Sequence, residues 1–311
     1  MDEYLRLENI CKSYETKKAV DDLSLSVPQG CIYGIIGPNG AGKTTTIRMI
    51  MNIIVPDSGN IFIKGAGVTK DFRNRVGYLP EERGLYKKMT LEEIIRFLAE
   101  IKGFPVRKIV ESMDSWLEKM SLLDYKGKKV EELSKGMQQK LQFITTLIHQ
   151  PELIILDELF SGLDPLNIEL IKNILLEEKR RGTTILFSTH VMEQAEKLCD
   201  YICMINNGRK VLDGRLAEVK SKFGTNSIQI NMEGDAGFIR EFSGVKKVTE
   251  FPNYIELKLS SDADSRAILK EVADRMTIRR FEIMEPSLYD IFINVAGVKP
   301  AELDREGKAD V

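Results

Sequence analysis

The sequence predicts an α/β fold in which helices cover a parallel sheet. Two apolar stretches of the strand type, ELIILDE (152–158) and TTILFSTH (183–190), are separated by the helical stretch PLNIELIKNILLEEKRRG (165–182). Because strand, helix and strand in this order form a right-handed crossover, the two strands are expected to lie parallel in one sheet. With 311 residues, 43% of them hydrophobic, the chain can form one large domain and a small one.

The amino-terminal part of the chain predicts an antiparallel β subdomain. LRLENICKSY (5–14) and VDDLSLSVPQG (20–30) alternate apolar and polar residues, as exposed antiparallel strands do. CIYGIIG (31–37) is a short apolar strand that ends at a glycine-rich turn, and KTTTIRMIMNI (43–53) has the pattern of a helix. We therefore expect strand, turn and helix in direct succession.

Residues from about 85 to 150 predict a helical subdomain. TLEEIIRFLAEIKG (90–103) carries a capping box in Thr90 and Glu93 and a stop signal in Gly103. Two further helices are expected over residues 106–123 and from about Ser134 to His149.

The pattern of apolar and polar residues changes near residue 220. Before that point, YICMINNGRKVLDG (201–214) predicts a hairpin that turns at Asn207 and Gly208. Beyond it, short alternating strands and two helical stretches indicate a small α+β domain of roughly 80 residues. The predicted limits are a main domain over 1–220, an accessory domain over 221–296 and a polar tail over 297–311.

Composition excludes several classes of protein. A formal net charge of -2 and a pI near 6.0 give no strong field for nucleic acid, so no nucleic-acid partner is expected. The cysteines lack the spacing of a zinc site or a disulfide scaffold and are expected to be reduced and mostly buried; they are Cys11, Cys31, Cys199 and Cys203. No secretion signal and no membrane-spanning stretch is expected, so the prediction is a cytoplasmic protein that reaches a membrane only through a partner.

The stretch GPNGAGKT fits the phosphate-binding pattern G-x-x-x-x-G-K-[ST] and stands where that pattern requires, after a strand and before a helix. In this pattern the glycines turn backbone N–H groups toward phosphates, the lysine reaches the β and γ oxygens, and the threonine hydroxyl binds Mg²⁺. The predicted ATP-binding residues here are Gly37, Pro38, Asn39, Gly40, Ala41, Gly42, Lys43, Thr44 and Thr45.

Three side chains at strand ends are the candidate metal ligand and catalytic groups. Asp157 would bind the metal ion, and Glu158 beside it would polarise the attacking water. His190 ends another strand at the sheet edge where ligands of open α/β sheets bind. The alternative is that two carboxylates end a strand in solvent and that His190 is a structural residue.

A second anion-binding pattern, LSKGMQQKLQ (133–142), places Ser134 and Gly136 at the head of a helix. The order of GPNGAGKT, LSKGMQQKLQ, LIILDE, SGLD and the strand-terminal His190 resembles the ATP-binding subunit of an ATP-binding cassette (ABC) transporter over residues 4 to 220. The fold that this resemblance implies is a P-loop NTPase cassette.

The resemblance also implies how the residues would be used. Tyr14 would stack on adenine, while Ser134 and Gly136 would contact the ATP held by a second cassette in a head-to-tail dimer, expected to be an identical copy. A separate transmembrane permease would be the other partner, and the cassette would lie on the cytoplasmic face of the cell membrane. The Asp164 loop would lie at the interface of the dimer.

Four positions depart from the family pattern. Lys135 and Met137 replace a glycine and a glutamine of the signature, and Leu159 replaces the proline after Glu158, which would loosen that turn. Glu81 stands where glutamine is usual; as a carboxylate it can still ligate Mg²⁺. The expected metal ligands are therefore Thr44, Glu81 and Asp157.

The variants YLPEERGLY and LSKGMQQKLQF are similar to bacterial export cassettes of the sodium-extrusion and drug-efflux kind. The leading hypothesis is the ATPase subunit of a membrane exporter. One alternative is a soluble cassette ATPase that acts on ribosomes or DNA, and another is a small-molecule or nucleotide kinase, which would leave the signature unexplained.

Overall fold

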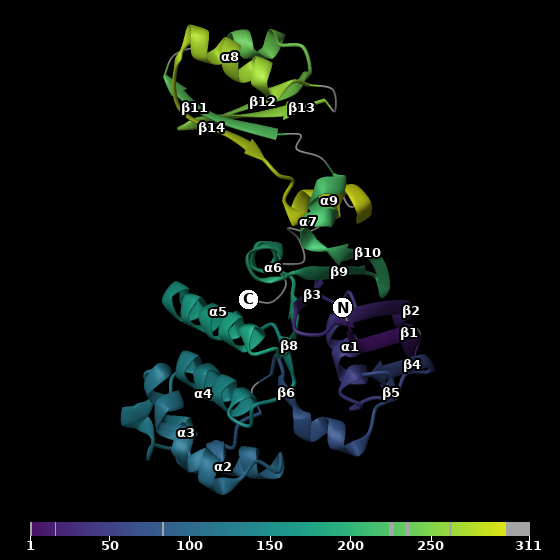
Figure 1. Ribbon diagram of the computed structural model, residues 1–311, viewed down its shortest axis with the longest axis vertical. Coiled ribbons are helices and arrows are strands. Elements are labelled where there is room, and N and C mark those ends of the chain that lie inside the picture. Colours follow the sequence, from purple (N-terminus) through teal and green to yellow (C-terminus); the bar gives the residue numbers. More distant parts are fainter. Residues whose placement is uncertain are drawn as a thin grey trace. The chain divides into compact units, whose positions relative to one another are not determined.

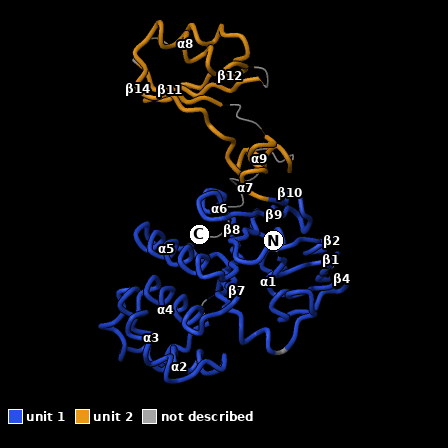
Figure 2. The backbone as a smooth tube through the Cα atoms, in the orientation of Figure 1, with its two compact units in different colours: residues 1–214, 301–311 blue, residues 215–300 orange. Residues whose placement is uncertain are grey.

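The computed structural model describes residues 2–15, 17–82, 84–223, 227–233, 237–260 and 263–296. These residues form two compact units that divide between Gly214 and Arg215 (Figure 2). The sequence predicts that the main domain ends at residue 220, six residues after this division, and that domain boundary stays a prediction. The polar tail expected at 297–311 lies outside the described residues. No helix among the described residues is long and apolar enough to cross a membrane.

A six-stranded sheet forms the centre of the first unit (Figure 1). Its order is β10-β9-β3-β8-β7-β6, and the pairs β9/β3, β3/β8, β8/β7 and β7/β6 are parallel. The predicted α/β class is confirmed. The strands are β3 (Ile32–Ile36), β6 (Val76–Leu79), β7 (Leu153–Asp157), β8 (Thr184–Thr189), β9 (Tyr201–Asn206) and β10 (Arg209–Arg215). Every residue of β3, β7 and β8 is buried, which explains their apolar sequences.

The antiparallel sheet of the first unit has the order β2-β1-β4-β5. Its strands are β1 (Glu3–Tyr14), β2 (Lys17–Pro28), β4 (Ser58–Ile63) and β5 (Ala66–Gly67). The alternation read in the sequence puts Leu5 and Leu23 into one core with Ile35 of the central sheet. Tyr14 is the last residue of β1, next to the turn that joins β1 to β2.

Helices surround the central sheet, and the capping box predicted at Thr90 and Glu93 is confirmed. Gly103 has a φ of 73°, as a helix stop requires. The helices of the unit are α1 (Lys43–Ile50), α2 (Leu91–Ile101), α3 (Val106–Lys119), α4 (Lys135–Leu147), α5 (Pro165–Arg180) and α6 (Met192–Leu198). Short 3-10 turns cover Lys70–Arg75, Leu123–Tyr125 and Val130–Glu132.

The second unit is built on a four-stranded antiparallel sheet of order β12-β13-β11-β14. The strands are β11 (Ser227–Glu233), β12 (Val245–Phe251), β13 (Tyr254–Leu259) and β14 (Thr277–Met284). The helices are α7 (Leu216–Lys222), α8 (Ser265–Arg275) and α9 (Leu288–Ala296), with a 3-10 turn over Gly237–Glu241. With that turn as the first helix, the chain order follows the split βαβ pattern of ferredoxin-like domains. Ile228, Leu257 and Val272 lie in its core.

Candidate functional site

The glycine-rich loop between β3 and α1 has a backbone shape that only glycine fits at two positions. Gly37 and Gly42 have φ angles of 155° and 107°, which side chains disfavour. A Cβ atom on Gly37 would lie 2.1 Å from the carbonyl oxygen of Ile205, and one on Gly42 would lie 2.3 Å from that of Ala19. The loop is thus fixed in one tight shape and leads directly into α1, whose first N–H groups favour an anion.

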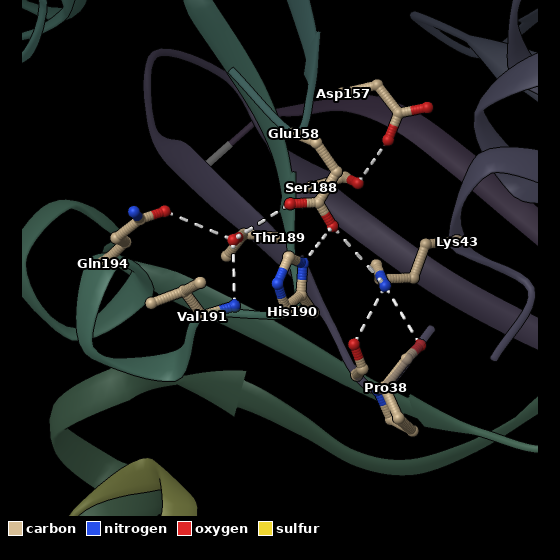
Figure 3. A network of polar contacts seen from close by, with 10 residues as sticks. Pro38, Lys43, Asp157, Glu158, Ser188, Thr189, His190, Val191 and Gln194 are labelled. Carbon is tan, nitrogen blue, oxygen red and sulfur yellow. Dashed lines mark hydrogen bonds and ion pairs between the residues drawn. The ribbon is translucent and has the colours of Figure 1, made fainter. Parts of the chain in front are cut away.

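Lys43, the first residue of α1, is held at the centre of the loop with only 6% of its surface exposed. Its ammonium donates hydrogen bonds to the carbonyl oxygens of Gly37 at 2.9 Å and Pro38 at 3.1 Å. It also lies 3.7 Å from Glu158 (Figure 3). Burial lowers the pKa of Lys43, while the carboxylates of Glu158 and Asp157 act in the opposite direction. A cation in so enclosed a position is ready for an anionic ligand.

Asp157 and Glu158 stand at the end of β7, where the central sheet ends. Asp157 is fully buried, and one of its carboxylate oxygens accepts a hydrogen bond of 2.6 Å from the Ser188 hydroxyl (Figure 3). The other, Oδ2, is buried and has no hydrogen-bond partner among the described residues. Burial raises the pKa of Asp157, and the hydroxyls of Ser188 and Thr44 lower it. An unpaired buried carboxylate oxygen is costly unless a ligand satisfies it.

Glu158 adopts a backbone conformation that is uncommon for a side-chain-bearing residue, with a φ of 51°. Its Oε1 lies 3.0 Å from Nδ1 of His190, the residue that follows β8 (Figure 3). The parallel pairing of β7 and β8, with Asp157 opposite Ser188, brings these two strand ends together. His190 is therefore a direct neighbour of the candidate catalytic carboxylate.

A pocket of 430 Å³ joins these groups. It is lined by Tyr14, Lys17, Ala19, Asn39, Gly40, Gly42, Lys43, Thr44, Thr45, Glu81 and Glu158. The structure thus gathers Tyr14, most of the glycine-rich loop, and Thr44 and Glu81 of the expected metal ligands around one space, while Asp157 is not part of the lining. Gly37, Pro38 and Ala41 complete the loop behind it, and Asp157 and His190 adjoin Glu158.

Glu81 belongs to this group of carboxylates, as the sequence suggested. Burial raises the pKa of Glu81, and the nearby negative charges of Asp157 and Glu158 add to the effect. The negative charges of Glu81, Asp157 and Glu158 disfavour one another, and a cation nearby would relieve that repulsion.

Ser134 and Gly136 are not among the described residues that line the pocket. The Ser134 hydroxyl caps α4 by accepting from the N–H of Met137 at 3.3 Å. Apart from its chain neighbours and the backbone of its own helix, a Cβ atom added to Gly136 would have no described atom within 4 Å. The head of α4 is therefore open, and its first residue, Lys135, is exposed, whereas Lys43 at the head of α1 is buried.

Leu159, at the position where the resemblance led us to expect proline, is packed into the core. Leu159 is fully buried, and its carbonyl oxygen accepts a hydrogen bond from the side-chain amide of Gln139. This contact from α4 holds the turn at Leu159, and the loosening expected there stays a prediction.

Lys17 and Ala19 line the pocket although the sequence did not single them out. Lys17 lies three residues after Tyr14, on the next strand of the same hairpin, and its ammonium would lie 3.8 Å from a Cβ atom on Gly40. Its position so close to Tyr14, the expected adenine-binding residue, is the feature of the sequence that could have identified Lys17.

Comparison with known proteins gives two family matches. The sequence model of the ABC transporter family matches residues 20–161. That of the C-terminal domain of DrrA1-3-like ATP-binding proteins matches residues 214–296.

Several relatives align with nearly the whole chain. The uncharacterized ABC transporter ATP-binding protein YhaQ of Bacillus subtilis is 43% identical over 293 residues, which covers 94% of this chain and 98% of that protein. The Nod factor export ATP-binding protein I of Sinorhizobium fredii is 33% identical over 94% of this chain and 86% of its own length. The linearmycin resistance ATP-binding protein LnrL of Bacillus subtilis is 30% identical over 94% of this chain and 98% of its own length.

Comparison of the fold with solved structures leads to the same family. A solved structure described as the ATP-binding subunit of an ABC transporter superimposes with a TM-score of 0.67 and 32% identity. The match covers 71% of this chain and 93% of that one.

Proposed function

The chain belongs to the ABC transporter family as one of its ATP-binding proteins, and from this premise we propose how its site couples ATP hydrolysis to export. It is an ATPase that powers a membrane transporter. The relatives named for Nod factor export and linearmycin resistance support the outward direction. A soluble ATPase acting on ribosomes or DNA is not favoured, because the full-length relatives are transporter proteins.

The pocket at the head of α1 supports ATP hydrolysis most directly. Tyr14 at one part of the lining suits an adenine ring, and Lys43 and the glycine-rich loop suit the phosphates. Glu158 would take a proton from the attacking water, with His190 holding its Oε1 at 3.0 Å. The observation that carries this proposal is the meeting of Lys43 and Glu158 in one pocket.

The same residues fit a magnesium ion. Mg²⁺ prefers oxygen ligands and takes one or two carboxylates together with substrate phosphates. The buried, unpartnered Oδ2 of Asp157 and the hydroxyl of Thr44 are of this type, and Glu81 offers a further carboxylate. No cluster of three His, Cys, Asp or Glu side chains among the described residues would hold a metal alone, so the nucleotide would complete the site. When bound, the ion would neutralise charge on the phosphates.

The open head of α4 would serve the ATP of a second copy of this chain. Ser134 and Gly136 lie outside their own chain's pocket, and a helix start favours an anion. In a head-to-tail dimer each ATP would then lie between α1 of one copy and α4 of the other.

A permease on a separate chain would dock beside the helical subdomain, at the cytoplasmic face of the membrane. A groove of 310 Å³ lies there. It is lined by Met51, Tyr78, Pro80, Gly84, Leu85, Leu98, Ile101, Lys102, Gln142, Thr145, Thr146 and His149. The lining includes Pro80 and Gly84, which stand on either side of Glu81 in the chain. A permease segment bound in the groove would therefore be able to shift the Glu81 carboxylate.

Docking can be separated from catalysis by substitution. Ile101→Asp and Glu82→Lys should reduce export by membranes while the ATPase rate of the purified chain stays within about twofold, since neither residue lines the ATP pocket. Val55→Asp, at another exposed apolar position, is the matched control. Full export by both variants would place docking elsewhere.

Glu158→Gln tests the catalytic assignment. The variant should bind ATP but hydrolyse it at least about a hundredfold more slowly, because an amide cannot act as a base. Single-turnover hydrolysis and nucleotide titration of the full chain measure the two properties. Parental turnover in Glu158→Gln would refute the role of this carboxylate.

A further inference from the structure

The hydroxyl of Thr189 lies between the catalytic carboxylate and an amide from α6 (Figure 3). Its Oγ1 is 3.5 Å from Oε2 of Glu158 and 3.3 Å from Oε1 of Gln194. It also accepts a hydrogen bond of 3.0 Å from the backbone N–H of Val191. Thr189 ends β8, so the sheet fixes its place beside Glu158.

The bonding capacity of this hydroxyl restricts how its neighbours are oriented. A hydroxyl has one proton and two acceptor lone pairs, and the N–H of Val191 occupies one lone pair. One proton and one lone pair remain for two neighbours. If Gln194 presents its carbonyl oxygen, both neighbours are acceptors and one of them goes without the proton.

Rotating the Gln194 amide by half a turn gives the Thr189 hydroxyl one acceptor and one donor as its two side-chain neighbours. The amide oxygen and nitrogen exchange places in that rotation, and their assignment follows from the hydrogen-bond network. The NH₂ group then donates to Thr189, and Thr189 donates its proton to Glu158. A carboxylate is the stronger acceptor of the two neighbours, which favours this direction.

The two oxygens of Glu158 differ in what surrounds them. Oε1 faces Nδ1 of His190 at 3.0 Å and the ammonium of Lys43 at 3.7 Å. Within the described chain, the hydrogen bond to Oε2 comes from Thr189. Oε2 therefore keeps a lone pair for the proton of the attacking water. The 3.5 Å separation is long for an O–H···O bond, as catalytic contacts are before substrate tightens them.

We propose that Gln194 and Thr189 form a relay of donated hydrogen bonds, from amide to hydroxyl to carboxylate, that aims Oε2 of Glu158 at the attacking water. Both are positioning residues, because they act through Glu158 and do not touch ATP. The inference rests on the proposed role of Glu158 as the catalytic base. Charge-assisted hydrogen bonds contribute enough to change a rate by about tenfold or more when one is lost.

The first test changes the hydroxyl. Thr189→Val keeps the shape and removes the proton, so kcat for ATP should fall about tenfold or more while KM stays within about twofold. Thr189→Ser restores the hydroxyl and should recover kcat to within about threefold of the parent. Parental kcat in Thr189→Val, or a loss in Thr189→Ser as large as that in Thr189→Val, would overturn the relay.

The second test reads the direction of the relay. Gln194→Glu offers only acceptors and would draw the Thr189 proton away from Glu158, so its kcat should fall more than that of Gln194→Leu, which leaves the proton free. If Gln194 instead presents its oxygen, Gln194→Glu should keep parental kcat, and the proposal fails. Glu193→Gln, on the same helix and paired with Lys197 in solvent, should match the parent.

These results are separable from a failure of the catalytic assignment. Thermal unfolding and ATP titration of each full-length variant show whether the fold and the binding pocket persist. A slow Glu158→Gln with a normal Thr189→Val rejects the relay alone. A normal Glu158→Gln rejects the base, and the relay with it.

Discussion

Helices α1 and α4 both begin with a lysine after a small residue, yet their first turns have opposite surroundings. Lys43 starts α1 inside a pocket, with 6% of its surface exposed. Lys135 starts α4 on the surface. A Cβ atom added to the next residue, Gly136, would meet no described atom within 4 Å outside its chain neighbours and its own helix backbone. The two helix starts have similar sequences. The chain surrounds the start of α1 with other residues and leaves the start of α4 exposed.

Most of the length of α4 is held in place by packing, although its start is exposed. All residues of α4 from Gln139 to Leu147 are buried, and Gln139 also holds the turn after Glu158 through the Leu159 carbonyl. A helix packed on every side keeps its exposed end in a fixed position. The comparison teaches that a helix start alone does not make an enclosed anion site, and under the proposed dimer a second copy of the chain would supply the missing enclosure at α4.

The largest expected effect comes from removing each starting lysine in turn. Lys43→Ala should raise the Kd for ATP about a hundredfold, since charge-assisted hydrogen bonds to phosphate are lost in an enclosed site. Lys135→Ala should leave the Kd of the single chain within about twofold. Isothermal titration with ATP measures both. A similar loss in both variants would mean that α4 also contacts the ATP of its own chain.

A carboxylate at the head of α4 should act only on the dimer. Gly136→Asp would oppose the γ-phosphate of the partner's ATP and should weaken ATP-dependent dimerisation about tenfold or more, while ATP binding by the single chain is kept. Gly136→Ala, which fits the open space, is the uncharged control. Sedimentation in a Glu158→Gln background measures the dimer.

Mixing two variants tests whether Lys43 and Gly136 act on the same ATP from different copies of the chain. Gly136→Asp and Lys43→Ala chains together can form one site with both halves intact, so partial dimerisation should return. If Gly136→Asp dimerises as well as the parent, α4 is not the partner's phosphate cap.

A smaller effect is expected at the buried end of α4. Burial lowers the pKa of His149 to about 4 from its ordinary 6.5, and Lys102 adds to the effect. The unfolded chain therefore takes up a proton first as pH falls, and unfolding becomes easier between pH 6.5 and 4. The contribution is on the order of 3 kcal/mol across that window. Chemical unfolding of the parent and of His149→Gln should show a shallower pH dependence in the variant; equal slopes would contradict it.

The smallest effect is expected from Lys17 at the rim of the ATP pocket. Lys17→Ala should weaken ATP binding about two- to fivefold, as an exposed cation facing phosphates contributes modestly. The loss should shrink from ATP to ADP to AMP, because the number of phosphates falls. Lys18→Ala, which removes a neighbouring lysine paired with Asp21, should bind all three normally. An equal loss for AMP and ATP would assign Lys17 to the nucleoside.

Two strands were not predicted from the sequence, and the structure shows why. Strand β6 (Val76–Leu79) contains Gly77 and precedes Pro80, so no alternation marks it; a Cβ atom on Gly77 would lie 2.2 Å from the Thr146 carbonyl oxygen. Strand β14 (Thr277–Met284) follows α8 almost directly and carries two adjacent arginines, and its pairing with β11 is interrupted by a register shift. In both cases a neighbour far along the chain defines the strand.

The sequence by itself determined what depends on adjacent residues. The glycine-rich loop, the acids that end β7, the capping box of α2 and the turn at Asn207 and Gly208 all follow from local backbone geometry and hydrogen bonding. Local patterns of this kind identified both helix starts and the α/β class.

Only the tertiary structure decided which of these groups meet. Parallel pairing of β7 and β8 brings Glu158 to His190 and Thr189, and the β1–β2 hairpin brings Lys17 to the loop before α1. It also decided that α1 begins in an enclosed pocket and α4 in the open. Strand register and packing join residues that are far apart in the chain, and no local pattern encodes such a distance.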